Sequence, residues 1–351
     1  MDRLAYLAKR LLLVIPTFIG ITLVCFSLTR FLPGGPVELR MMRAKGMGSE
    51  VHGAASTASG TGAMGVSDDY RKQLESQFGF DKPLYVQYWD WLAVNRMGLT
   101  LPSYDYPDKT AWQLIKSRIP VSLWFGIASF LLTYLVCIPL GIAKALRHRQ
   151  AFDAVSSVIV FAAYAIPSFA FAMLLKMAFC GTVEGFPDWF PLGGISSDFD
   201  LEPTWGEWLV DRAWHMVLPV LCYVAGSFAM LTLLVKNSLL DQISADYVRT
   251  VIAKGGSRRR AIWLHALRNA LIPVATGMGS VIGFMFAGSI IIETVFEIPG
   301  MGRLSWDALI GRDYAVFLAL LSLTASLQLV GNLISDILYT IIDPRMDFSG
   351  K

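Results

Sequence analysis

The sequence predicts an all-α integral membrane protein with six transmembrane helices, from its composition, its apolar runs and the charge of its loops. Hydrophobic residues make up 54% of the 351 residues and charged residues only 16%, against about 25% charged in a typical soluble domain. Several apolar runs approach or exceed the ~20 residues that a helix needs to cross the hydrocarbon. The length alone would allow two soluble domains, but apolar runs of this length argue against them.

Six apolar runs are candidate spans, at about 11–28, 121–143, 154–179, 216–235, 271–292 and 317–339. The first follows Arg3, Lys9 and Arg10, as in a cleaved signal peptide, but a small-residue cleavage site is missing after it. We therefore interpret residues 1–32 as a cytoplasmic end followed by a retained first helix.

Loop charges indicate the orientation of these spans, because short loops rich in Lys and Arg stay in the cytoplasm. Lys144, Arg147 and Arg149 follow the second span, and the loop 236–270 carries seven basic residues. The segment 181–212 instead holds seven acidic residues and a single base. We expect that segment outside and both termini in the cytoplasm.

A long outer segment, 33–119, separates the first two spans. Its 46–67 part is rich in Gly, Ala and Ser, so it cannot bury much apolar area, and we expect it to be flexible. Residues 120–351 hold the other five helices and the basic loop.

The basic loop 236–270 has internal structure of its own. A short helix is expected from about Ala245 to Ala253, since Gly255-Gly256 can end it and Ser257 can cap the next helix. Four apolar residues share one face of this short helix: Tyr247, Val248, Val251 and Ile252. A loop offers such a face no core of its own, so we expect it to fit a groove in a partner.

The residue order in this loop resembles the coupling loop of ABC-importer permeases, in the variant of the dipeptide/oligopeptide branch. The matching runs are Asp246-Tyr247-Val248-Arg249-Thr250, Ala253-Lys254-Gly255, His265-Ala266-Leu267-Arg268-Asn269-Ala270 and Pro273. The runs 214–219 and 343–351 look most like the Yej-type (microcin C and peptide) permeases. The resemblance covers nearly the whole chain and implies the type I importer permease fold, with a small periplasmic insertion between helices 1 and 2.

The resemblance also implies a function: the inner-membrane permease subunit of an ATP-driven bacterial peptide importer, which is not itself an enzyme. It implies a second homologous permease, a cytoplasmic ABC ATPase that binds ATP and Mg, a periplasmic solute-binding protein, peptide substrates and surrounding lipid, and no nucleic acid. The chain has no G-x-x-x-x-G-K-[ST] phosphate loop of its own, and we expect no cofactor in it. The implied ATPase-coupling residues are Asp246, Tyr247, Val248, Arg249, Val251, Ile252, Ala253, Lys254 and Gly255.

Further matching patches and polar residues in the spans supply candidates for the pathway and the periplasmic gate: Pro167, Ser168, Lys176, Gly279, Gly283, Glu293 and Phe296. Pro167 permits a kink that either lines the cavity or only packs helices. Lys176 either snorkels or pairs with an acid, or it faces the path and meets a peptide carboxylate. Gly279 and Gly283 allow close helix approach, within the chain or against a second permease.

Near the end of the sixth span, Asp336 either pairs with a nearby base or belongs to the pattern that closes the span. We favour the ion pair.

Two rival classes remain. A secondary transporter would usually show an internal repeat and a buried coupling-ion site, and we find no such repeat in the sequence. A membrane-embedded hydrolase would need a nucleophile and a base at mid-membrane depth, and no serine has the G-x-S-x-G context. A Walker motif in a neighbouring coding sequence would favour the importer over both.

Overall fold

The computed structural model describes residues 3–31, 37, 41, 72, 75, 76, 79–197 and 203–342. The expectations for 46–67 and 343–351 lie outside them. Contacts divide the chain into two compact units. The larger unit combines Met1–Val14, Arg118–Leu304 and Ser326–Lys351, and the smaller one combines Ile15–Ser117 and Ser305–Ala325.

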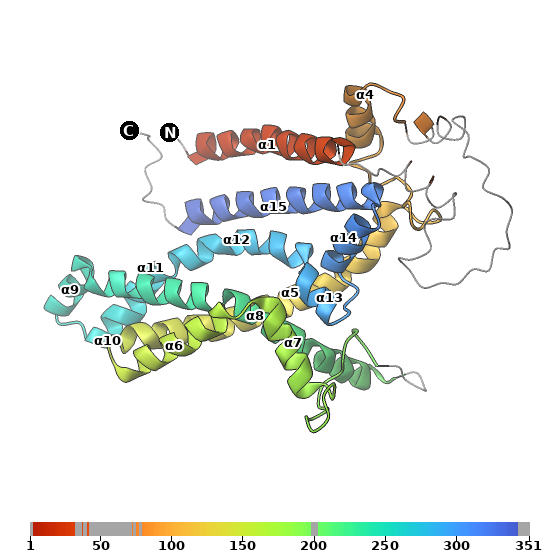
Figure 1. The fold of residues 1–351 in the computed structure, drawn as a ribbon. Helices are drawn as coiled ribbons and strands as arrows, with labels where there is room; N and C mark the ends of the chain where they lie inside the picture. The colour runs from red at the N-terminus through yellow and green to blue at the C-terminus, as the bar shows by residue number, and fades with distance from the viewer. Residues whose placement is uncertain are drawn as a thin grey trace. The chain divides into compact units, whose positions relative to one another are not determined.

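Within the described residues, four helices are long and apolar enough to cross a membrane (Figure 1). They are Ala8–Arg30 within α1 (Arg3–Phe31), α5 (Ala111–Leu146), α8 (Trp205–Ser244) and α15 (Tyr314–Ile342). A fifth is added if α6 (Ala151–Ala165) and α7 (Ser168–Phe179) count as one bent span. The expected span 271–292 contains only α12 (Ile272–Ala287), which stops before Gly288. Length and composition therefore support four or five of the six expected spans.

The break between α6 and α7 confirms the kink expected at Pro167. The two helices meet at 97°. Ile166 has an extended ψ of 122°, because the ring of a following proline clashes with helical backbone at the preceding residue. The kink is therefore a full interruption of the helix, and Ser168 begins a new helix in a different direction.

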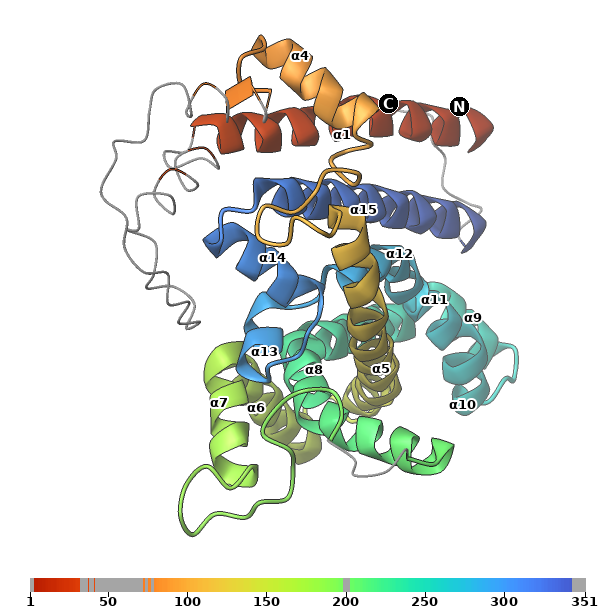
Figure 2. The same cartoon turned by 90° about the vertical axis from the view of Figure 1, so that its right-hand side faces the viewer.

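The core of the larger unit forms around α8, whose 40 residues reach about 60 Å. Thr204 begins the helix with a capping box that includes Glu207. In the middle of α8, Leu218 and Cys222 are buried in one apolar cluster with Phe296. Figure 2 shows α7 and α13 (Ile290–Val295) close to α8, and all three pairs of these helices are in contact. We call residues 288–304, which include the gate candidates Glu293 and Phe296, the outer loop, and α13 anchors this loop on the long helix.

Small residues let α12 lie close to its neighbours in the larger unit. A Cβ on Gly283 would be 3.1 Å from the Cα of Gln328 in α15, and one on Gly126 of α5 would be 2.9 Å from the Cα of Met285. The sequence predicts that Gly279 and Gly283 pack either within the chain or against a second permease. At Gly283 the packing is within the chain. Gly279 lies in α12, but its surroundings are outside the described part of the chain.

The remaining helices of the larger unit belong to the basic loop. They are α9 (Asp246–Ala253), α10 (Arg258–Arg260), a π-helical turn at Ala261–Ala266, and α11 (Leu267–Ala270). At the other end of the sequence, Arg10 pairs with Asp336 at 3.3 Å. This contact confirms the ion pair expected for Asp336.

In the smaller unit, α4 (Leu84–Trp89) and a π-helical turn at Asp90–Val94 pack on α1. The Tyr88 hydroxyl lies 2.9 Å from that of Thr22, and Phe26, Trp91 and Leu318 form a small apolar cluster. The carboxylate of Asp313, beside the first residue of α15, accepts hydrogen bonds from the backbone N–H groups of Tyr104 and Val316. Helix α14 (Met301–Ile310) runs from the larger unit into this one.

Candidate functional site

The short helix of the basic loop forms where the sequence predicts it. Helix α9 spans Asp246–Ala253, and the chain turns behind it at Gly255, whose φ of +86° suits glycine. The Ser257 hydroxyl then accepts a hydrogen bond from the Arg260 N–H at 3.3 Å, which caps α10 as expected. Figure 1 shows α9 beside the end of α8.

One expectation about α9 is wrong: its apolar face has a core in this chain. Val248 is 3% exposed and belongs to a cluster with Ala145 of α5 and Leu239 of α8. Tyr247 and Val251 pack against the same cluster. The face is covered because the residues after α10 fold back under α9, which brings Ala261 and Ala266 into contact with it.

The outward face of α9 carries the other implied coupling residues. The side chains of Asp246 and Arg249 are 95% and 76% exposed, and their charged groups lie 3.6 Å apart. Ile252 is 43% exposed, and the last three implied residues, Ala253, Lys254 and Gly255, are exposed as well. A partner that binds α9 therefore meets a mixed charged and apolar surface.

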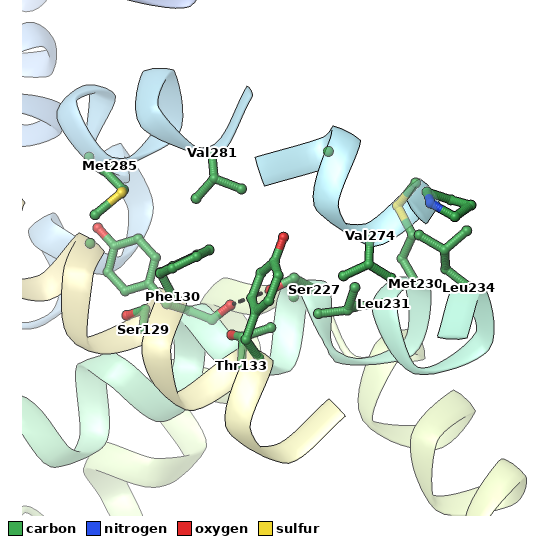
Figure 3. Close-up of a pocket in the computed structure, with 17 residues that line it drawn as sticks. Ser129, Phe130, Thr133, Ser227, Met230, Leu231, Leu234, Val274, Val281 and Met285 are labelled. Atoms are coloured by element: carbon green, nitrogen blue, oxygen red, sulfur yellow. Dashed lines mark hydrogen bonds between the residues drawn. The ribbon is translucent and has the colours of Figure 1, made fainter. Parts of the chain in front are cut away.

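A cavity of about 460 Å³ opens between α5, α8 and α12 (Figure 3). Its apolar lining includes Phe130, Met230, Leu231, Leu234, Val274, Val281 and Met285. Hydroxyl groups come from Ser129, Thr133, Tyr134, Tyr223 and Ser227. No charged side chain is among the described residues that line the cavity. Such a surface suits a neutral or apolar guest, because an ion would leave water here without a partner.

The described residues that line this cavity do not include the following sequence-predicted pathway residues: Pro167, Ser168, Lys176, Gly283, Glu293 and Phe296. The hydroxyl residues of α5 were missed, although the sequence carries a signal for them. Ser129 and Thr133 stand at i and i+4 in an otherwise apolar span, so they share one helix face. Polar residues in a span usually face a helix bundle or a cavity.

Glu293 sits at the centre of the outer loop and is 1% exposed. Its carboxylate accepts hydrogen bonds from the Ser122 hydroxyl at 3.1 Å, the Ser289 N–H at 3.4 Å and the Arg303 N–H at 2.8 Å. Burial raises the pKa of Glu293, and the hydrogen bonds, with that from the Arg303 N–H first, partly oppose the rise. A Cβ on Gly302 would be 2.6 Å from the Ile290 nitrogen, so the loop closes only with glycine there.

Lys176 supports the same outer loop. Its ammonium donates a hydrogen bond to the Val295 carbonyl at 2.6 Å and lies 6.0 Å from the centre of the Phe296 ring. Val295 ends α13, so the lysine caps the negative end of that helix. Phe296 itself is 2% exposed and packs in the main core cluster. Lys176, Glu293 and Phe296 are thus brought together as a scaffold for the outer loop, while Pro167 and Ser168 mark the break before α7.

Comparison with known proteins gives a consistent result. Residues 137–348 match the family described as "Binding-protein-dependent transport system inner membrane component". The inner membrane ABC transporter permease protein YejB of Escherichia coli O157:H7 is 39% identical over 99% of this chain and 100% of its own. The peptidoglycan transport system permease protein YejB of Agrobacterium fabrum is 37% identical over 99% of each chain. The dipeptide transport system permease protein DppB of Escherichia coli K12 is 32% identical over 98% of each.

Proposed function

The chain belongs to the binding-protein-dependent transport system inner membrane components, and on that premise we propose that it is the permease subunit of an ATP-driven peptide importer. Two of its relatives are named for dipeptide and peptidoglycan transport and align over almost their full length. ATP hydrolysis belongs to a partner in such a system. The observation that carries the mechanism is the exposed face of α9, whose opposite face packs against the ends of α5 and α8.

The proposed topology has six spans, with both termini in the cytoplasm. The short helix α12 and the bent pair α6–α7 complete the four long spans. The basic turn 144–149 and the basic loop 236–270 then lie on the inner side, and the acidic segment 181–212 and the insertion 33–119 lie outside. This orientation presents α9 to the cytoplasm.

We assign the cavity between α5, α8 and α12 to this subunit's half of the translocation pathway. A second homologous permease would complete it from the side where Met230 is 78% exposed. The uncharged lining favours passage over tight binding, because it offers no fixed ion partner for either end of a peptide. Selection of substrate would then rest on a periplasmic solute-binding protein.

The ATPase would receive the outward face of α9 in a groove. Ile252 supplies an exposed apolar contact, and Arg249 and Lys254 add positive charge that sets orientation. When two ATPase subunits close on ATP, the α9 helices that they hold are drawn together. Inverting a 1:99 population of inward and outward states takes roughly 5.5 kcal/mol of differential binding.

The experiment changes residues on the exposed face of α9 and leaves its buried face intact. We expect Arg249→Glu combined with Ile252→Asp to give a membrane-inserted permease that no longer retains its ATPase during purification. Tyr247 and Val251 are unsuitable targets, because they pack against the chain's own core.

Arg259→Glu is the matched control for this experiment. It repeats the Arg→Glu change at an exposed position of the same loop, outside α9. Retention of the ATPase by the double variant at the wild-type level would refute the docking assignment. Loss of the ATPase in both the double variant and the control would also refute it, because a general charge effect would then explain the loss.

A further inference from the structure

A lysine of α5, Lys144, is completely buried beside the basic loop. Its ammonium donates hydrogen bonds to the hydroxyls of Ser156 and Ser157, each at 2.8 Å, and to the Asp153 carbonyl at 3.0 Å. It also lies 3.3 Å from an oxygen of the Asp153 carboxylate. A buried charge is tolerated only with such a full set of partners. The end of α5 is therefore fixed to the first turns of α6.

The same carboxylate binds a second lysine from a different helix. Lys236 of α8 places its ammonium 2.6 Å from one oxygen of Asp153 and 2.8 Å from the other. The Arg149 N–H donates to Asp153 at 3.3 Å from the turn between α5 and α6, and His148 Nδ1 lies at 3.3 Å. Asp153 thus links α5, α6 and α8, although Lys236 lies 83 positions after Asp153 in the sequence.

This ionic junction lies next to the place where α9 is seated. Ala145 follows Lys144 in the sequence, and Leu239 lies one helical turn after Lys236. Both are buried in the cluster that holds Val248 of α9. A force on α9 therefore reaches α5 and α8 through apolar contacts at the very turns that Asp153 ties together.

We propose that Asp153 and Lys236 form a clasp that transmits the movement of α9 to α5 and α6, so that the ATPase stroke moves the wall of the cavity. This inference rests on the proposed function. The two residues are positioning residues, since neither lies at α9's outward face or in the cavity lining. Without the clasp, only the apolar cluster links α9 to α5, so α8 can tilt relative to α5 and α6, and more ATP is hydrolysed without opening the pathway.

The test removes the link to α8 and leaves the rest of the junction in place. Lys236→Met deletes one charge at a side chain that is 12% exposed and preserves the Lys144–Asp153 pair. We expect the complex to assemble with its ATPase, while the number of ATP molecules hydrolysed per peptide imported rises. Residues in coupling networks change coupling by about 0.5–2 kcal/mol, which corresponds to a factor of about 2 to 30.

Two further variants serve as controls for this test. Lys236→Arg retains the charge and can bind both oxygens of the Asp153 carboxylate, so it should keep the wild-type ATP-to-peptide ratio. Asp90→Asn breaks the partly exposed ion pair with Lys82 in the smaller unit and should leave the ratio unchanged.

An unchanged ratio in Lys236→Met would overturn the clasp, and so would a lower yield of complex with a normal ratio, because that result indicates a structural role only. Absence of an ATPase from the wild-type complex would instead overturn the proposed function.

Discussion

The buried carboxylate of Glu293 allows a quantitative test of how the outer loop is held. Glu293→Gln preserves shape but replaces one acceptor oxygen by an NH2 donor. The present carboxylate accepts from Ser122, Ser289 and Arg303, so at least one buried donor loses its acceptor. A buried polar group without a partner costs about 1–3 kcal/mol. At acid pH the protonated Glu293 carboxyl still has acceptor capacity on both oxygens, whereas the Gln amide has it on one, so we expect the variant to be less stable by that amount.

The assay is thermal unfolding of the purified full-length permease in detergent, with its pH dependence. For domains of roughly 150–250 residues, 1 kcal/mol moves the Tm by about 2–4 °C. Because burial raises the folded-state pKa of Glu293 above its ordinary 4.5, the native state binds this proton more tightly than the unfolded chain. The stabilisation is complete below that ordinary value and is lost as pH rises through the raised pKa. The difference in Tm between wild type and variant should therefore shrink as pH rises.

The control for this experiment lies four residues away. Glu297→Gln makes the same chemical change at an exposed position of the same loop, and surface substitutions of this kind usually alter stability by less than about 0.5 kcal/mol. Equal effects of the two substitutions would refute the reasoning, as would a Tm difference for Glu293→Gln that grows with pH.

Three further predictions concern other parts of the chain. Lys176→Met removes the donor to the Val295 carbonyl, so uptake should fall alike for all peptides; a loss confined to one charge class of peptide would place Lys176 in the pathway instead. Gly226→Leu, where the cavity leaves open space for a side chain, should reduce the import rate with normal protein yield, whereas Gly20→Leu on an exposed face of α1 should leave import unchanged. Asp313→Asn removes a buried acceptor of backbone N–H groups, so limited proteolysis should cut the loop before α5 faster; an unchanged cleavage rate would contradict this role.

Helix ends and helix breaks that depend on one or two neighbouring residues could be predicted from the sequence. The end of α9 follows from the turn at Gly255, the start of α10 from the cap at Ser257, and the helix break from Pro167. Each depends on backbone restrictions of one or two residues, which a sequence displays directly. The sequence predicts an ion pair for Asp336 but not its partner, because Arg10 lies near the other end of the sequence.

Contacts between distant segments could not be predicted in this way. The spacing of Val248 and its neighbours correctly indicated an apolar face on α9, but periodicity does not say what covers a face. The covering residues come from Ala145, Leu239 and the turn after α10. The partners of Asp153 are equally hidden, because Lys236 is far away in sequence and a charge near the end of a span is ordinarily solvated.

The buried face of α9 changes how force can pass through the permease. If α9 offered its whole apolar face to a partner, it would be joined to the helix bundle only through its link to α8. A pull on α9 would then first extend the loop. Instead Val248 is packed into the same cluster as the ends of α5 and α8, so α9 behaves as a rigid extension of the helix bundle. The exposed face, with Arg249 and Ile252, remains available to the ATPase. On the proposed function, a stroke applied there would displace the ends of helices that also line the cavity, because one short helix has both a buried and an exposed face.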